Sequence, residues 1–306
     1  MRAIVSTPSG SDRVELIDDV AEPAPRPGEA LVAVESFSVN RGELALLAAR
    51  PQGWRPGQDV AGVVLAAAAD GSGPPAGTRV VGLVEQAGWA QRVAIDTGKL
   101  VDLPQDVTMA DAATLPIAGL TALRTLRLGG SILGRRVLIT GAAGGVGHLQ
   151  TQLAAVAGAQ VVAVTRRENV HSELLAAGAH EVVHDVSDAD GLFDMILEGV
   201  GGRSFSKVIG KAGPGSTIVL FGASDVEPSQ LSLLDFFGHE NAVIQTYFSY
   251  ANLAPVKDDL AALIRLMQSG QLTVRLGAHR PWSEINAVLD DLHAGSIDGK
   301  AVLHIK

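Results

Sequence analysis

Glycine and alanine make up most of residues 141–147, Gly-Ala-Ala-Gly-Gly-Val-Gly, a composition that leaves the main chain open to an anionic ligand. The apolar run 137–139 precedes this segment, and apolar residues follow it at helical spacing: Val146, Leu149, Leu153 and Val156. We therefore expect a strand, a tight turn and the N-terminus of a helix. The first N–H groups of a helix have no intrahelical partner, and the helix dipole favours an anion. Because small residues let a phosphate approach the main chain, the segment predicts a phosphate-binding turn.

The small residues of this turn have the spacing A-x-G-x-x-G of a dinucleotide-binding fingerprint, with these residues at the key positions: Ala142, Gly144 and Gly147. The next predicted strand, 160–165, ends in Thr165 and is followed by Arg166 and Arg167. An NAD-binding fold usually has an acid here that holds the ribose 2′-hydroxyl. No carboxylate repels a 2′-phosphate in this chain, and two guanidinium groups can bind it, so we expect NADPH rather than NADH. The alternative is that the arginine pair is ordinary solvated surface.

Composition limits the class of protein. The 306 residues are 47% hydrophobic and 19% charged, which is enough for two globular domains of ordinary size. The net charge of −9 argues against non-specific nucleic-acid binding, and no apolar run approaches the roughly 20 residues of a membrane span. The N-terminal residues contain no signal-peptide core, so we expect a cytoplasmic protein. The lack of cysteine excludes disulfides, thiolate catalysis and cysteine-based metal sites.

The periodicity of the chain changes along its length. Residues 1–117 contain short strand-like runs separated by Gly and Pro turns, which predicts a compact β-rich domain. Strands alternate with helices over 118–252, which predicts an α/β domain with a doubly wound parallel sheet. A helix over 253–269 and a tail that ends in a strand at 299–303 follow, and this strand could rejoin the first domain. We therefore expect one domain from 1–117 and 253–306, and a second from 118–252.

Several motifs, in this order, resemble the medium-chain dehydrogenase/reductase superfamily over essentially the whole chain. They are Ser38-Val39-Asn40-Arg41, Gly57-Gln58-Asp59-Val60-Ala61-Gly62-Val63-Val64, Leu115-Pro116-Ile117-Ala118-Gly119-Leu120-Thr121-Ala122, Gly141-Ala142-Ala143-Gly144-Gly145-Val146-Gly147, Gly199-Val200-Gly201-Gly202 and Gly299-Lys300. The chain resembles in particular the zinc-free quinone oxidoreductase branch. The resemblance implies a GroES-like β-rich domain beside a Rossmann domain. It also implies hydride transfer from NADPH to a small-molecule substrate, a quinone or an α,β-unsaturated carbonyl.

Two positions separate the chain from its zinc-dependent relatives. Those enzymes have a cysteine where Asn40 stands and a histidine where Gln58 stands, so zinc catalysis of their type lacks its ligands. The segment 180–184 reads His-Glu-Val-Val-His, a metalloprotease pattern that requires a helix. We expect a strand there, which would separate the two imidazoles by roughly 13 Å. No metal site is therefore predicted.

Asn40, Arg41 and Glu43 are the candidate catalytic residues. By resemblance Asn40 lies near the nicotinamide ribose, and Arg41 could hold an anionic substrate or an enolate. The alternative for Arg41 and Glu43 is a surface ion pair at the start of a helix. A tyrosine that some family members have nearby as a candidate donor is missing. The expected cofactor-binding residues are Asn40, Thr121, Ala142, Ala143, Gly144, Gly145, Val146, Gly147, Thr165, Arg166, Arg167, Val200, Phe221, Gly222, Tyr247, Phe248 and Lys300.

Other functions remain open. The missing tyrosine and the unusual segment 40–43 also fit a non-catalytic NADPH-binding sensor or scaffold, or an enzyme of this fold recruited to a specialised biosynthetic step. The apolar sixth strand of the parallel sheet, 242–248, should lie at the sheet edge, where unpaired backbone groups invite another chain. We therefore expect a homodimer, as the resemblance also implies; the alternative is that the helix at 253–269 or a loop covers this edge in a monomer.

Overall fold

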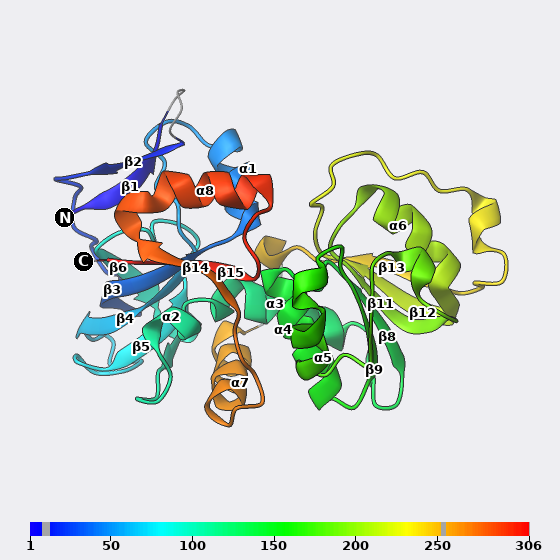
Figure 1. Ribbon diagram of the computed structural model, residues 1–306. Helices are drawn as coiled ribbons and strands as arrows, with labels where there is room; N and C mark the ends of the chain where they lie inside the picture. Colours follow the sequence, from blue (N-terminus) through cyan, green and yellow to red (C-terminus); the bar gives the residue numbers. More distant parts are fainter. Residues whose placement is uncertain (8–12, 252–254, 306) are drawn as a thin grey trace. The chain divides into compact units, whose positions relative to one another are not determined.

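The chain divides into two compact units (Figure 1). Each unit has its own hydrophobic core. The computed structural model describes residues 1–7, 13–251 and 255–305. Unit 1 consists of Met1–Leu120 and Ala254–Lys306, and unit 2 consists of Thr121–Leu253. The boundary near residue 120 falls inside helix α3 (Leu115–Arg127). The domain boundary predicted at 252 and 253, and the predicted start of the last long helix, lie outside the described residues.

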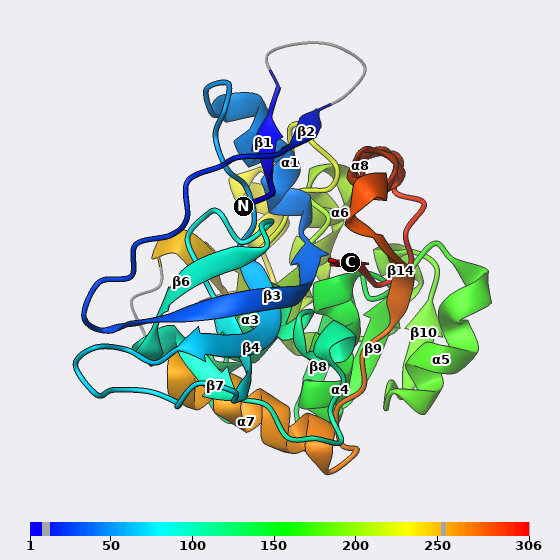
Figure 2. The same ribbon diagram turned by 90° about the vertical axis from the view of Figure 1, so that its left-hand side faces the viewer.

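Unit 1 is built mainly on antiparallel strands. Within the described residues its larger sheet has the order β14-β15-β3-β4-β5-β7, with β6 pairing with β3, and Figure 2 shows the long strand β3 beside β4. The C-terminal strand β15 lies antiparallel to β3, with Ala301 opposite Val39, so the tail rejoins the β-rich region as predicted. The strands are β1 (Ala3–Ser6), β2 (Val14–Ile17), β3 (Glu29–Val39), β4 (Asp59–Ala66), β5 (Arg79–Leu83), β6 (Arg92–Asp96), β7 (Leu100–Asp102), β14 (Leu276–Pro281) and β15 (Lys300–His304).

Aromatic and branched side chains fill the core of unit 1. Phe37 and Trp89 are both fully buried and stack with ring centroids 5.7 Å apart. The helices of this unit, apart from its share of α3, are α1 (Arg41–Ala49), α2 (Met109–Ala112), α7 (Val256–Gln268) and α8 (Ile285–Ala294). Helix α1 follows β3 directly, so the residues that end this strand and begin this helix, 38–43, are held from both sides.

Unit 2 contains one parallel sheet, with the strand order β10-β9-β8-β11-β12-β13 among the described residues. The order reverses between β8 and β11, as in a dinucleotide-binding fold. Figure 1 shows α4 and α5 on one face of the sheet and α6 on the other. The predicted doubly wound α/β fold is therefore confirmed. Its elements are β8 (Arg136–Thr140), α4 (Gly145–Val156), β9 (Gln160–Val164), α5 (His171–Ala176), β10 (Glu181–Val183), β11 (Phe193–Glu198), α6 (Gly202–Val208), β12 (Ala212–Leu220) and β13 (Val243–Thr246).

Helix α4 is more deeply enclosed than its apolar spacing predicts. Leu149 and Leu153 are buried as expected, but Val156 is half exposed and the polar stretch 150–152 is buried. Gln150 Nε2 donates to Thr125 Oγ1 of α3 at 2.8 Å, so α3 contacts α4 through polar side chains. The apolar spacing does not predict this contact.

We find that the helices of the described ranges are all too short or too polar to cross a membrane.

Candidate functional site

The glycine-rich turn forms the predicted strand–turn–helix. Gly141 leaves β8 with a φ of +63°, and Gly144 N donates to Gly141 O at 2.9 Å, which closes the turn before α4 begins. A Cβ atom at Gly147 would lie 2.5 Å from Gly141 O, so only glycine fits there without a backbone shift. The α4 N-terminus, with small residues that leave its main chain accessible, fits the pyrophosphate of a dinucleotide.

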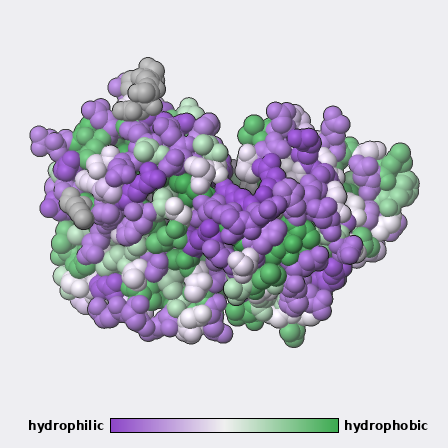
Figure 3. Space-filling model, viewed as in Figure 1, coloured by the Kyte–Doolittle hydropathy of each residue, from purple (hydrophilic) through white to green (hydrophobic). Residues whose placement is uncertain are grey.

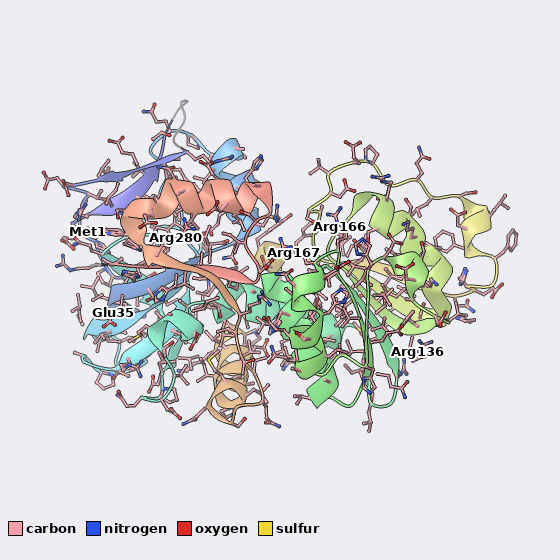
Figure 4. The ribbon with its side chains drawn as sticks, in the orientation of Figure 1. Met1, Glu35, Arg136, Arg166, Arg167 and Arg280 are labelled. Atoms are coloured by element: carbon pink, nitrogen blue, oxygen red, sulfur yellow. The ribbon has the colours of Figure 1, made fainter. Side chains whose placement is uncertain are left out.

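Two arginines follow the strand next to this turn. Strand β9 pairs with β8, and Thr165, just after β9, is buried and accepts a hydrogen bond from Arg167 N at 3.2 Å. Arg166 is exposed and Arg167 is half-buried; both are labelled in Figure 4. Because β8 and β9 are parallel, their carboxyl ends share one edge of the sheet, and the arginines lie on the same edge as the glycine turn.

A buried carboxylate, Glu198, lies at the reversal point of the sheet and is not among the site residues predicted from the sequence. It ends β11 and is 1% exposed. Its Oε1 accepts from Thr140 Oγ1 at 2.9 Å, Val200 N at 3.2 Å and Ser204 Oγ at 2.8 Å. Its Oε2 accepts from Gly201 N at 2.8 Å. The available signal was an acid that closes an apolar strand directly before the glycine-rich segment 199–202.

The loop after Glu198 meets two other segments of unit 2. Val200 O accepts from Asp225 N at 2.7 Å, and a Cβ atom at Gly222 would lie 2.7 Å from Gly199 O. A Cβ atom at Gly141 would lie 3.3 Å from Val200 Cγ2. The structure thus brings the glycine turn together with the predicted site residues that follow β11 and β12, which are Val200, Phe221 and Gly222.

The other predicted cofactor residues of unit 2 differ in exposure. Thr121 in α3 is buried, and its carbonyl accepts from Thr125 Oγ1 at 2.7 Å. Tyr247 follows β13, is 6% exposed and donates its N–H to Leu220 O at 2.8 Å. Phe248 is half exposed, and its ring lies 5.5 Å from that of Tyr250. Phe248, which follows strand β13, thus contacts the ring of Tyr250, which is itself exposed.

Unit 1 contains a buried polar cluster that joins β3, β4 and β15. Asp59 Oδ2 accepts from Ser38 Oγ at 2.5 Å and from Asn40 Nδ2 at 2.8 Å. Lys300 Nζ donates to Asn40 Oδ1 at 2.5 Å and lies 3.5 Å from Asp59 Oδ2. Asp59 Oδ1 accepts from Ile117 N at 2.8 Å. Both polar ends of the Asn40 side chain are therefore fixed within the protein.

Glu43 belongs to the same cluster. It is completely buried, and its Oε2 accepts from Asn40 N at 2.8 Å. Burial and the neighbouring Asp59 raise the pKa of Glu43 to about 8, and contacts with Asn40 and Lys300 offset part of the shift. Burial likewise lowers the pKa of Lys300 below its ordinary value. The alternative interpretation for this helix start, a surface ion pair between Arg41 and Glu43, is therefore wrong, because Glu43 is completely buried.

Arg41 and Gln58 are sequence neighbours of residues in this cluster, but they are more exposed to solvent than its members. Arg41 is the first residue of α1 and is exposed. Gln58 is half-buried, and its carbonyl accepts from Val84 N at 2.9 Å. Over the described ranges, three or more His, Asp or Glu side chains nowhere gather in a way that could hold a metal ion. The segment 180–184 contains strand β10, as predicted, and not a helix.

Comparison with known proteins agrees with this architecture. Residues 145–269 match the family model described as zinc-binding dehydrogenase. A chloroplast envelope quinone oxidoreductase homolog of Arabidopsis thaliana is 27% identical, over 92% of this chain and 90% of its own length. A mycocerosic acid synthase-like polyketide synthase of Mycobacterium tuberculosis is 29% identical over 100% of this chain, which spans 15% of that protein.

A solved mycobacterial structure in complex with NADPH has the same fold, with a TM-score of 0.87 and 23% identity over 99% of each chain. The glycine turn, the strand order and these relatives agree with one another. The chain belongs to the medium-chain dehydrogenase/reductase superfamily of NAD(P)-dependent oxidoreductases and is quinone oxidoreductase-like.

Proposed function

We propose that the protein is a zinc-independent, NADPH-dependent reductase of quinones or α,β-unsaturated carbonyl compounds. The observation that carries the proposal is the phosphate-binding turn of unit 2 with Thr165, Arg166 and Arg167 after the neighbouring strand. The cofactor, when bound, supplies the hydride. The protein then has to hold both molecules and to stabilise the enolate or hydroquinone oxygen with hydrogen bonds.

The choice of NADPH depends on charge. A 2′-phosphate needs cationic donors, and Arg166 and Arg167 offer two planar guanidinium groups where an NAD-binding protein would have an acid. Arg166 is exposed, so a bound phosphate could pair with it without first breaking a buried contact. The pyrophosphate would be held by the first turn of α4, whose residues 144–146 are partly exposed to solvent.

The donor set of unit 1 supports the proposed independence from zinc. Asn40 and Gln58 replace the cysteine and histidine of the zinc-dependent relatives. The ammonium group of Lys300 already lies on Asn40 Oδ1 and near Asp59 Oδ2, so a cationic side chain occupies the place that these oxygens would offer to an ion. We propose that Asn40 and Lys300 orient the bound molecules and that Glu43 fixes Asn40 through its backbone N–H. The exposed Arg41 would hold an anionic substrate or the enolate.

The test compares the two nicotinamide cofactors. Changing both Arg166 and Arg167 to alanine should weaken NADPH binding far more than NADH binding, since a hydrogen bond to a charged group contributes about 1.5–3 kcal/mol. Titration calorimetry gives both dissociation constants. The exposed Arg203 of α6, changed to alanine, is the matched control. If the double variant weakens both cofactors equally, the arginines do not bind the 2′-phosphate.

A second candidate function keeps the fold but changes the substrate. The relation to a polyketide synthase over the full length of this chain favours an enoyl group carried by an acyl thioester. A panel of quinones, free enones and enoyl thioesters, followed by NADPH oxidation, distinguishes these substrates. Binding of NADPH without oxidation by any member of the panel would favour the non-catalytic sensor or scaffold.

We also propose a homodimer formed through the edge strand β13. It is the last strand in the sheet order, and its residues Val243 and Ile244 are 47% and 37% exposed. The preceding segment adds the exposed apolar side chains of Leu233, Leu234 and Phe237. Figure 3 shows hydrophobic surface over this part of unit 2. An uncovered apolar edge invites a second copy by two-fold pairing.

Light scattering tests the assembly. We expect twice the 31.6 kDa of the chain at micromolar concentration. The variant Ile244→Lys should give a monomer, because a lysine on an edge strand opposes pairing. Leu133→Lys, at a position that is 76% exposed before β8 and outside the proposed interface, is the control. A monomer of the unchanged protein would reject the proposal.

A further inference from the structure

We propose that Glu198 is a positioning residue that fixes the nicotinamide half of the cofactor site by joining the two halves of the sheet where the strand order reverses. The inference rests on the proposed cofactor site and adds to it a residue that touches no cofactor atom itself. In this role Glu198 holds the loop 199–202 at a fixed distance from the glycine turn 141–147.

The strand order assigns the two halves of the site. A dinucleotide lies across the reversal point of such a sheet, with one mononucleotide on each half. Arg166 and Arg167, the residues proposed to bind the 2′-phosphate, follow β9. The adenosine half of the cofactor would therefore bind at β8, β9 and β10. The nicotinamide half then belongs to β11, β12 and β13. Glu198 is the last residue of β11 and stands at the beginning of that second half.

Glu198 connects the halves through Thr140. Thr140 ends β8, is 1% exposed, and donates from Oγ1 to Glu198 Oε1 at 2.9 Å. The same hydroxyl accepts from Gly199 N at 3.0 Å. One buried hydroxyl thus binds both the carboxylate and the first residue of the loop, so the end of β8 and the start of the loop keep a fixed spacing.

The carboxylate also shapes the loop 199–202 directly. Val200 N and Gly201 N both point to it, at 3.2 and 2.8 Å, and Gly201 has a φ of +81°. On its other side the loop is held by Asp225 N, which donates to Val200 O at 2.7 Å. The loop is therefore fixed between the end of β11 and the segment after β12. Since Val200 lies against the position of Gly141, a small shift of the loop would move it into the turn or away from it.

Only an acid of this length satisfies the arrangement. Every contact of the two oxygens comes from a donor: Thr140 Oγ1, Val200 N, Ser204 Oγ and Gly201 N. A glutamine has one accepting oxygen, and its NH₂ group would face one or more of these N–H or O–H donors. Glu198→Gln should therefore release part of the loop while it preserves the size of the side chain.

The experiment separates the two halves of the cofactor with a fragment. Titration calorimetry on the full chain measures NADPH and adenosine 2′,5′-bisphosphate, which contains only the adenosine half. In Glu198→Gln we expect NADPH to bind about tenfold more weakly or worse, whereas the bisphosphate keeps its affinity within about twofold. A general loss of structure would lower both affinities together, so the difference between the ligands identifies a positioning role.

A second pair of variants keeps the test valid if Glu198→Gln does not fold. Thr140→Val removes the connecting hydroxyl and should give the same difference between ligands, and Thr140→Ser restores the hydroxyl and should restore NADPH affinity. Ser206→Ala is the control, because Ser206 lies on the same helix as Ser204 and instead accepts from Gln230 N.

The outcomes distinguish this inference from the proposed function. If the unchanged protein binds neither NADPH nor the bisphosphate, the proposed cofactor site is wrong, and this inference is wrong with it. If the unchanged protein binds both, but the variants weaken both equally, weaken only the bisphosphate, or weaken neither, the cofactor site stands and the role of Glu198 is overturned.

Discussion

Glu43 in unit 1 and Glu198 in unit 2 are both buried glutamates, and they are surrounded differently. Both oxygens of Glu198 accept hydrogen bonds, from two backbone N–H groups and two hydroxyls. Glu43 accepts from Asn40 N through Oε2, whereas its Oε1 is buried and forms no hydrogen bond of ordinary geometry with the described residues. A second carboxylate, Asp59, lies close enough to Glu43 to raise its pKa further.

The difference shows two ways of burying an acid. Donors that converge on a carboxylate replace the water it loses and fix its position, so such a group can hold a loop in one place. Where a second acid is nearby and donors are few, the buried acid keeps its proton instead. In unit 1 the acids Glu43 and Asp59 are packed with one lysine, and a proton on Glu43 leaves Asp59 and Lys300 as a balanced pair.

The largest expected change in the free energy of unfolding comes from removing the Lys300 cation from the buried cluster of unit 1. Lys300→Met would leave Asp59 buried without its counter-ion, and breaking a buried ion pair in this way costs about 3–5 kcal/mol. Lys207→Met is the control, because the pair of Lys207 with Asp185 is about 40% exposed on each side and such pairs contribute about 0–1 kcal/mol. Urea unfolding measures both. Equal losses of stability in the two variants would show that the buried pair of Lys300 and Asp59 contributes no more than the exposed pair.

The second prediction concerns pH and Glu43. Its folded pKa of about 8 lies above the ordinary value of 4.5, so between these values the folded chain holds a proton that the unfolded chain releases. The stability that this group contributes is complete below pH 4.5 and is lost as the pH rises through 8. Glu43→Gln imitates the protonated acid, so its stability relative to the unchanged protein should increase from pH 5 to pH 8.

Thermal or urea unfolding at pH 5, 6.5 and 8 measures this difference. One pKa unit corresponds to about 1.4 kcal/mol, so the change across the range should reach a few kcal/mol. Glu181→Gln, on the edge strand β10 where Glu181 is exposed, should show no comparable change. A constant difference between Glu43→Gln and the unchanged protein over this range would mean that Glu43 is ionised in the folded state.

The sequence predicted the path of the backbone better than the surroundings of the polar groups. The turn at 141–147 could be predicted because its signal is local: an apolar strand, small residues and a helical repeat stand next to one another in the chain. The alternation of strands and helices then predicted a doubly wound sheet, since parallel strands need crossover connections.

The contacts of the buried acids were not predictable in the same way. Glu198 meets Thr140, a residue 58 positions away in the chain, because strands β8 and β11 become neighbours only where the strand order reverses. Lys300 meets Asn40 across 260 positions; the resemblance suggested both residues but not their contact. Glu43 follows Arg41 at the start of a helix, a pattern typical of the surface, and its burial beside Asp59 and Lys300 depends on segments that are distant in the chain.

The smallest effect compares one hydroxyl donor from each cluster. Ser38 Oγ donates to Asp59 and is fully buried, whereas Ser204 Oγ donates to Glu198 from a half-buried position. Ser38→Ala should cost about 1.5–3 kcal/mol, as for a hydrogen bond to a charged group. Ser204→Ala should cost about 0.5–1.5 kcal/mol, because water can reach the vacated position and Thr140, Val200 and Gly201 still donate to the carboxylate.

Urea unfolding at pH 7 measures both variants. If Ser204→Ala costs as much as Ser38→Ala, the donors around Glu198 do not share its stabilisation, and the contrast between the two buried acids would have to rest on the pH dependence of Glu43 alone.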